Sequence, residues 1–328
     1  MPESGAQLTV RLMHTERDMN KTITLLKEKI PCLKVKENVL LSSCTSFRTG
    51  GLAEIAAYPG SIEELGILLK VCKQENIPFY VLGNGTNVLA PDEGVKGIVI
   101  LMSEMRGIHI DKNNSLDEAE ITYTVTSGAG TLLSALAMEC AKKKLTGLEF
   151  ARGIPGSVGG AVVMNAGAYG GEIRDSLVSV KVMKDDGSEP FEMTCEELEL
   201  GYRHSVIPER GLLVLEATFM LKKGDKDAIF GLMEELATKR KEKQPLEFPS
   251  AGSMFKRPEG YFAGKLIEDA GLKGFTVGGA QVSEKHAGFI INKGGATSAD
   301  IMKLITEVQK RVFETSGVKL EPEVRFMK

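Results

Sequence analysis

Hydrophobic residues recur along this chain with two periods, one typical of helices and one typical of strands. Behind Ser61, apolar positions from Leu65 to Cys72 recur at helical spacing, with Glu64 three residues after the serine. This pattern predicts a helix that Ser61 caps and in which Glu64 completes a capping box. The apolar run 79–82 follows and is typical of a strand, so the two segments predict a helix-then-strand unit.

The same reasoning places elements further along the chain. Strict alternation over 121–126 predicts a half-buried strand, and Thr131 is expected to cap a helix that runs to about Lys143. Further strands are expected over 177–183 and 212–221, and short strands over 318–320 and 324–326.

Two later segments carry amphipathic helical patterns. The helix over 227–243 is expected to bury Ile229, Leu232, Met233 and Leu236 and to end at Pro245. The helix over 299–314 carries its apolar residues on one face and is expected to end at Gly317. Its apolar face consists of Ile301, Leu304, Ile305, Val308 and Val312.

Composition narrows the class of protein. The 328 residues carry a net charge of −3 without charge blocks, which argues against a general nucleic-acid or membrane surface. No apolar run approaches the roughly 20 residues that span a bilayer, and the charged segment 13–18 does not fit a signal peptide. These features predict a cytoplasmic protein, for which we expect no obligate protein partner.

Cysteine and histidine are too dispersed to suggest a metal centre. The five cysteines lie singly and the four histidines form no metal-binding motif, so we expect no protein-bound transition metal. Isolated cysteines of this kind are typical of buried thiols in a reducing compartment.

Two glycine-rich segments carry the clearest chemical signal. Residues 151–172 combine many glycines and alanines with little charge, and a second such segment, Gly83–Asn87, begins where the predicted strand 79–82 ends. Glycine lets a ligand approach the main chain, and successive exposed N–H groups form a site suited to phosphate. Tight turns alone are the simpler interpretation, but two such segments favour a large phosphorylated ligand.

Known phosphate and nucleophile motifs do not fit these segments. Val88 stands where the dinucleotide fingerprint requires its third glycine, and 90–94 would break the helix that the fingerprint opens. The segment 260–266 is one residue short of a P-loop, and Leu266 replaces its Ser or Thr. Around Ser157 the nucleophile-elbow pattern fails at Pro155.

Six motifs in order identify a resemblance. They lie at 47–51 (FRTGG), 83–87 (GNGTN), 153–173 (GIPGSVGGAVVMNAGAYGGEI), 202–205 (YRHS), 250–255 (SAGSMF) and 321–325 (EPEVR). From about residue 41 onward the chain resembles the UDP-N-acetylenolpyruvoylglucosamine reductase (MurB) family. That family has a longer type with a tyrosine-bearing loop and a shorter type, and the modest spacing between Arg203 and Ser253 favours the shorter type.

The resemblance implies an α+β fold of the PCMH type (vanillyl-alcohol-oxidase-like). It divides the chain into an N-terminal helical extension over 1–40, an FAD-binding domain over 41–225 split near 101, a substrate-binding domain over 226–316, and a strand over 317–328 that returns to the FAD-binding domain. The implied cofactors are FAD and, as electron donor, NADPH. The FAD pyrophosphate is expected on the two glycine segments and the flavin ring near 165–169. The implied FAD contacts are Arg48, Gly83, Asn84, Gly85, Thr86, Asn87, Gly153, Ile154, Gly156, Ser157, Gly160, Asn165, Gly167 and Ala168.

The resemblance also implies three catalytic residues that reduce UDP-N-acetylglucosamine enolpyruvate to UDP-N-acetylmuramate. Arg203 and Glu323 are expected to stabilise an enolate-like intermediate, and Ser253 to donate the proton. Arginine offers a forked cation, whereas Glu323 would have to be protonated to donate a hydrogen bond. Taken singly, Arg203 fits a surface ion pair equally well, Ser253 a turn, and Glu323 a cross-strand charge pair with Arg325.

Candidates for binding the substrate are less distinctive. Tyr202 belongs to a family motif, His286 lies in a loop where it could equally bind a carbonyl, and cations are the candidates for the diphosphate. The cationic candidates are Arg240, Lys243, Arg257 and Lys265, each of which also fits a solvated surface charge.

Two other functions stay open from the sequence. A flavin oxidase of the same fold would act on an alcohol or hydroxy acid, and such relatives often tether FAD through a His or Cys that neither glycine segment offers. A nucleotide-binding protein without catalysis would have no use for Arg203, Ser253 and Glu323 together.

Overall fold

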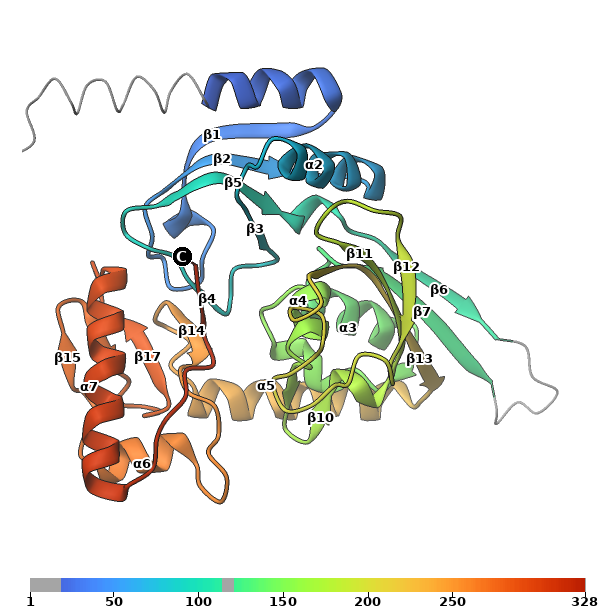
Figure 1. Cartoon of the computed structure of the whole chain (residues 1–328). Coiled ribbons are helices and arrows are strands. Elements are labelled where there is room, and N and C mark those ends of the chain that lie inside the picture. Colours follow the sequence, from blue (N-terminus) through green and yellow to red (C-terminus); the bar gives the residue numbers. More distant parts are fainter. Residues whose placement is uncertain (1–18, 114–120, 328) are drawn as a thin grey trace, which may run out of the picture.

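The computed structural model describes residues 19–113 and 121–327 (Figure 1). After a helix over residues 19–29, the first sheet has the strand order β1-β2-β5-β3, with β1 antiparallel to β2 and the remaining neighbours parallel. Its strands are β1 (Lys34–Leu40), β2 (Leu52–Tyr58), β5 (Val95–Leu101) and β3 (Phe79–Leu82), and helix α2 (Ile62–Gln74) packs beside them.

A second, larger sheet is antiparallel throughout and has the order β12-β11-β13-β7-β6, with β8 also pairing with β13. Its strands are β6 (Ile108–Lys112), β7 (Thr122–Gly128), β8 (Leu145–Thr146), β11 (Leu177–Lys184), β12 (Phe191–Thr194) and β13 (Leu212–Lys223). The helices α3 (Leu133–Lys142), α4 (Val158–Val163), α5 (Lys226–Lys243) and η4 (Glu149–Gly153) accompany it, with the small hairpin β9 (Gly167–Ala168) and β10 (Gly171–Glu172).

The C-terminal part has its own sheet, with the order β14-β17-β16-β15. It comprises β14 (Ser250–Ser253), β15 (Thr276–Val277), β16 (Ala280–Val282) and β17 (Phe289–Asn292), with helices α6 (Ala263–Asp269) and α7 (Ser298–Ser316). From α7 the chain runs back toward the first sheet, where β18 (Arg325–Phe326) pairs in parallel with β4 (Val88–Leu89) (Figure 1). The C-terminal end of the chain therefore joins the two parts. Besides η4, the described residues form the short 3-10 helices η1 (Leu41–Ser43), η2 (Met102–Glu104) and η5 (Ile173–Asp175).

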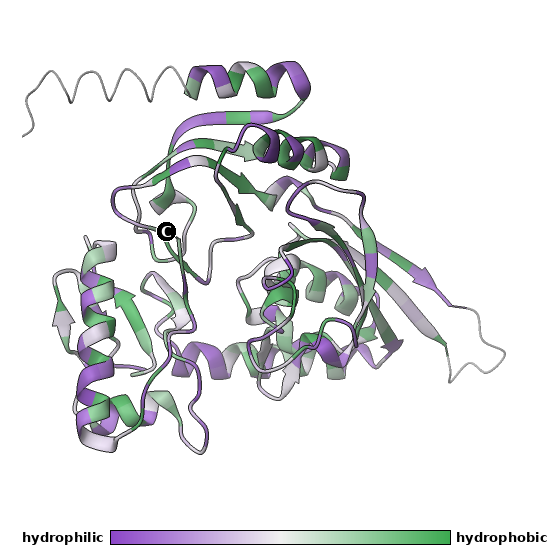
Figure 2. Cartoon of the chain, in the orientation of Figure 1, coloured by the Kyte–Doolittle hydropathy of each residue, from purple (hydrophilic) through white to green (hydrophobic). Residues whose placement is uncertain are grey.

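Separate hydrophobic cores stabilise these parts. One core lies between the first sheet, the large antiparallel sheet and their helices and includes Ile229 and Met233 of α5, while another holds the C-terminal part together around the apolar face of α7. Figure 2 shows apolar and polar bands alternating along α2 and α7, the pattern expected of helices that bury one face. The mixed architecture confirms the predicted α+β class.

Several predicted elements are confirmed with small changes. Ser61 caps α2 by accepting a hydrogen bond from the Glu64 N–H, but the Glu64 carboxylate accepts from the Gly60 N–H rather than from Ser61. The strand predicted over 121–126 and the end of α7 at Gly317, in the left-handed region, are both found. The local hydrophobic pattern therefore predicted these elements correctly.

Other predictions are wrong. Thr131 does not cap α3, which begins after Leu132, because its hydroxyl bonds to the Gly107 backbone instead. Leu232 is exposed, since α5 buries a narrower stripe than its composition suggests. Residues 318–320 form no strand.

At the N-terminus and among the cysteines the structure also differs from expectation. The predicted helical extension over 1–40 does not continue through residues 34–40, which form β1, and its first 18 residues lie outside the described residues. Cys72 and Cys140 are buried, and burial raises the pKa of each thiol to about 12, but Cys32 is exposed. Within the described ranges no helix is both long and apolar enough to cross a membrane.

Candidate active site

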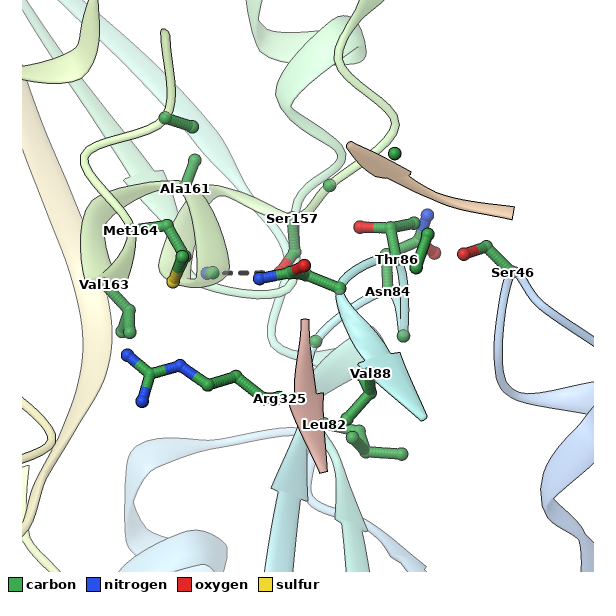
Figure 3. Close-up of a pocket in the computed structure, with 18 of the residues that line it drawn as sticks. Ser46, Leu82, Asn84, Thr86, Val88, Ser157, Ala161, Val163, Met164 and Arg325 are labelled. Atoms are coloured by element: carbon green, nitrogen blue, oxygen red, sulfur yellow. Dashed lines mark hydrogen bonds between the residues drawn. The ribbon is translucent and has the colours of Figure 1, made fainter. Parts of the chain in front are cut away.

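A cavity of about 1310 Å³ runs along both glycine segments. The loop Gly83–Asn87 leaves the end of β3, the segment 154–161 leads into α4, and both segments line the cavity. Asn84 ties them together by donating from its side-chain amide to the Pro155 carbonyl. In Figure 3, Asn84, Thr86 and Ser157 lie near each other, with Ser46 on the neighbouring loop. The cavity exceeds the roughly 300–1,000 Å³ of drug-sized ligand sites, as a dinucleotide requires.

The glycines of this cavity have two roles: some leave space for a ligand, and others are required by the backbone conformation. An added Cβ at Gly156 would meet no protein atom closer than Thr86 Oγ1 at 3.6 Å, so this glycine leaves space for a ligand. An added Cβ at Gly85 would instead lie 1.9 Å from the Cys44 carbonyl oxygen, and Gly85 has φ +60°. Gly85 is therefore required by the fold of the loop. Small residues and polar groups along the cavity fit FAD, and the buried hydroxyl of Ser46 has no partner among the described residues.

Arg203 and Glu323 form an ion pair beside this cavity, 120 residues apart in sequence. Arg203 Nε donates to Glu323 Oε1 at 2.7 Å, and its Nη2 donates to the Gly167 carbonyl at 3.3 Å. The two side chains are only 22% and 13% exposed. A buried pair of this kind holds both groups in one geometry and leaves the rest of the guanidinium fork for a ligand.

A strained turn presents Arg203. The His204 N–H donates to the Gly201 carbonyl, and Arg203 takes φ +55° at the third position of this turn. Glycine or asparagine is usual there, and strain at a non-glycine residue is typical of functional sites. Asn165 stabilises this turn, because its buried amide donates to the Gly201 carbonyl at 3.1 Å and to Glu172 at 3.0 Å.

Burial raises the pKa of Glu323, although the neighbouring Arg203 and Lys256 cations oppose that shift. The raised pKa favours the protonated carboxyl, which can donate a hydrogen bond. The backbone fixes the residue on both sides: its N–H donates to the Met254 carbonyl at 2.8 Å, and Asn87 donates to its carbonyl at 3.2 Å. The backbone of Glu323 is thus bonded to the loop Gly83–Asn87 and to Met254, the residue that follows β14.

A second cavity of about 360 Å³ lies against the C-terminal part. Tyr202, Arg257, Lys265 and His286 line it, as do Lys273 and Lys285 at positions that the sequence did not single out. The Arg257 backbone N–H donates to the Tyr202 hydroxyl at 3.2 Å.

The charged groups of the second cavity differ in their partners. The guanidinium of Arg257 stacks 4.0 Å from the centre of the Phe262 ring, while Lys265 pairs with Asp269. Burial lowers the pKa of His286, whose Nδ1 accepts from the Gly288 N–H at 3.1 Å. The cavity therefore offers cations and a neutral imidazole to a ligand.

Three residues line both cavities. Of the residues that the structure describes, only Arg203, Ser253 and Glu323 do so. Ser253 ends β14 directly after Gly252, which has φ +78°, and its side chain is exposed to the cavities. A group in the large cavity and one in the small cavity would thus meet at these three side chains.

The other predicted residues fall into three groups. The large cavity is lined by Arg48, Gly83, Asn84, Gly85, Thr86, Asn87, Ile154, Gly156, Ser157, Gly160, Gly167 and Ala168. Gly153, Asn165 and Lys243 line neither cavity. Arg240 lines the large cavity rather than the small one.

Sequence reasoning missed Ser46 and Arg325, which line the large cavity, as well as Lys273 and Lys285. In Figure 3 the Arg325 side chain extends toward Val163 and Met164. A signal for Arg325 was present, because in an extended segment residues 323 and 325 share a face. The two lysines carry no local signal that distinguishes them from surface charges.

Comparison with known proteins agrees with this geometry. Residues 53–189 match the model of an FAD binding domain, and residues 244–327 match the model of the UDP-N-acetylenolpyruvoylglucosamine reductase C-terminal domain. Two curated relatives named UDP-N-acetylenolpyruvoylglucosamine reductase, from Clostridium novyi (strain NT) and Lachnoclostridium phytofermentans, are each 49% identical over 94% of this chain and cover 96% and 97% of their own lengths.

A solved structure is similar over most of the chain. The enzyme of that name from Thermus caldophilus superposes with a TM-score of 0.74 at 38% identity, covering 90% of this chain and 100% of its own. Together with the FAD-domain match, this similarity confirms the predicted PCMH-type fold.

Proposed function

The chain belongs to the family of UDP-N-acetylenolpyruvoylglucosamine reductases, and on that premise we propose that it reduces UDP-N-acetylglucosamine enolpyruvate to UDP-N-acetylmuramate with NADPH. Family membership makes it an FAD-dependent oxidoreductase of peptidoglycan precursor synthesis. One observation supports the specific reaction: Arg203, Ser253 and Glu323 alone among the described residues line both cavities. Cofactor in the large cavity and substrate in the small one would then react at these side chains.

The residues divide the work of binding. Gly83–Asn87 and 154–160 would hold the FAD pyrophosphate with backbone N–H groups, and FAD supplies the capacity to accept hydride from NADPH and deliver it to the substrate. Arg257, Lys265, Lys273 and Lys285 would hold the diphosphate in the small cavity. This places the enolpyruvyl group at the junction of the two cavities.

At the junction, side chains of the protein would stabilise the developing negative charge and supply a proton. Hydride addition to the methylene carbon leaves the electron pair on the neighbouring carbon and the substrate carboxylate, as an enolate. Arg203 would bind this developing anion with its free N–H groups, and protonated Glu323 would donate a hydrogen bond to it. Ser253 would then give its hydroxyl proton to the carbon that carries the charge. Serine is a weak acid, so the cations beside it would have to favour its alkoxide.

Two half-reactions test this proposal. The purified protein is expected to be yellow with FAD that is released on denaturation, to lose its flavin absorbance with NADPH under anaerobic conditions, and to regain it with UDP-N-acetylglucosamine enolpyruvate. Mass spectrometry should show UDP-N-acetylmuramate in amounts equal to the flavin reoxidised. FAD retained covalently would favour an alcohol or hydroxy-acid oxidase, and bound FAD that NADPH never reduces would favour a non-catalytic binding protein.

A further inference from the structure

The inward face of α5 ends in a cation. Ile229, Met233, Leu236 and Arg240 follow one another at intervals of four, three and four residues, so they lie on one face of the helix. Ile229 and Met233 are buried in the core and Leu236 packs against it. The fourth member of this apolar stripe is an arginine, and it enters the large cavity.

Arg240 has no acidic partner in the described part of the chain, where none of the ion pairs includes its guanidinium. Burial lowers the pKa of Arg240, and the neighbouring phenol of Tyr169 opposes that shift. Buried charges in proteins are normally paired, so an unpaired guanidinium at a cavity wall indicates an anionic or electron-rich ligand.

The neighbouring backbone is shaped to admit this side chain. A Cβ at Gly153 would lie 3.0 Å from Arg240 Cδ and 3.1 Å from its Nη1. Glycine at this position therefore leaves room for the guanidinium against the start of the second glycine segment. Arg240 thus lies against Gly153, which does not itself line the cavity.

Arg240 also lies at the catalytic end of the cavity. Tyr169 follows Gly167 and Ala168, which line the same cavity, and Arg203 donates to the Gly167 carbonyl. One short hairpin thus connects Arg240 with the Arg203–Glu323 pair. If hydride passes to substrate at that pair, the ring of the cofactor, not its pyrophosphate, lies in this part of the cavity.

We propose that Arg240 binds the pyrimidine edge of the flavin ring and stabilises the negative charge that the ring acquires when it is reduced. The inference rests on the proposed function, because it requires FAD with its ring at the junction. Hydride transfer from NADPH to N5 yields NADP⁺ and a reduced ring that carries one negative charge over N1 and the C2 carbonyl. A cation at this edge binds the reduced form more tightly and raises its potential.

Gln244 supports the same assignment. It follows α5 one turn after Arg240, lines the same cavity, and its buried side-chain oxygen has no partner among the described residues. A flavin pyrimidine edge offers acceptors at N1 and the C2 carbonyl and a donor at N3–H. Arg240 as donor and the Gln244 oxygen as acceptor complement that edge.

The midpoint potential of bound FAD tests the proposal without turnover. In Arg240→Gln we expect the preference for reduced over oxidised FAD to fall about tenfold to a hundredfold, a shift of about 30 to 60 mV to more negative potential. Arg240→Lys keeps the positive charge, so the midpoint potential of this variant should lie close to that of the parent protein. If Arg240→Gln does not fold, as far-ultraviolet circular dichroism would show, the comparison of Arg240→Lys with Lys243→Gln still decides: the former should shift slightly and the latter not at all.

Other outcomes overturn the proposal. An unchanged potential with weaker binding of both FAD forms would make Arg240 a pyrophosphate ligand, and an unchanged potential with a higher substrate KM would make it a diphosphate ligand. A shift seen in Arg325→Gln but not in Arg240→Gln would transfer the role to the other arginine of the cavity. Failure of the proposed function is separate, because the unmodified protein would then bind no FAD or fail to reoxidise with substrate.

Discussion

The two glycine segments of the large cavity, here called the cradle, and the junction of the two cavities lie side by side but are built on different principles. The cradle is made of two continuous glycine-rich segments whose backbone shape creates the site. The junction is made of Arg203, Ser253 and Glu323, which come from three distant segments and are joined by one ion pair and a few backbone hydrogen bonds. The cradle therefore depends on space, whereas the junction depends on charge.

The largest expected effect is the loss of FAD binding when a glycine of the cradle is replaced. In Gly156→Val the side chain would extend into the space lined by Thr86, so FAD binding should be abolished while the apoprotein keeps its stability. In Gly85→Val the new Cβ would clash with the Cys44 carbonyl at positive φ, so the free energy of unfolding should also fall, by about 3 kcal/mol or more. Flavin absorbance and denaturant unfolding of the apoproteins measure the two effects.

Gly231→Val is the matched control, because Gly231 lies in α5 and its added Cβ would meet no described atom within 4 Å beyond the backbone of its own helix. It should leave both FAD binding and stability unharmed, since glycine is a poor helix former. Retention of FAD by Gly156→Val would show that the pyrophosphate lies elsewhere.

A substitution at the junction should leave FAD binding by the cradle unchanged. Ser253→Ala should retain FAD and its reduction by NADPH, because neither needs this hydroxyl. Reoxidation by substrate should slow by about 10²–10⁴-fold, the usual contribution of general acid catalysis. Stopped-flow absorbance of the flavin follows each half-reaction. Reoxidation within a few-fold of the parent rate would remove Ser253 from the role of proton donor, and equal slowing of both halves would indicate a displaced flavin.

The same contrast explains what the sequence could predict. The cradle was predictable because glycine spacing and the strand before Gly83 are local features, and helices such as α2 and α7 follow from local periodicity. Family resemblance singled out Arg203, Ser253 and Glu323 as the proposed catalytic residues, because nothing local distinguishes Arg203 from a surface arginine. Its ion pair with Glu323 exists only after β18 has paired with β4.

The errors have a similar origin. Thr131 has the sequence context of a cap, but tertiary contact with Gly107 takes its hydroxyl. The predicted contact of Asn165 with FAD stays a prediction, and the amide of this residue holds the turn that presents Arg203. The predicted division of the chain at 226 stays a prediction, and the packing of Ile229 and Met233 in the first core bears on it.

A smaller expected effect is a pH dependence of reoxidation that comes from Glu323 at the junction. Burial raises the pKa of Glu323, so the carboxyl is protonated below that raised pKa and ionised above it. If the protonated form donates the hydrogen bond, reoxidation by substrate should be fastest at low pH and fall with rising pH, up to about tenfold per unit. Glu323→Gln keeps a donor and should flatten this profile at a cost of about tenfold to a hundredfold in rate.

A control addresses the other titrating group of the small cavity. Burial lowers the pKa of His286, so its proton is lost at lower pH than usual. His286→Gln should therefore preserve the decline at high pH. A decline that survives in Glu323→Gln and disappears in His286→Gln would assign the titration to the histidine.

The smallest expected effect concerns substrate affinity at the outer side of the junction. Arg257 lines the small cavity, stacks on Phe262 and has no carboxylate partner within the described parts of the chain, so its forked cation is available to a diphosphate. Arg257→Gln should raise the substrate KM about tenfold with little change in kcat, and Arg257→Lys should fall between, because an ammonium group lacks the fork. Lys243→Gln, at a residue that lines neither cavity, should change neither constant. Equal increases in KM for Arg257→Gln and Lys243→Gln would indicate that the protein attracts substrate through its overall charge. An increase confined to Arg257 would show that this cavity binds the diphosphate.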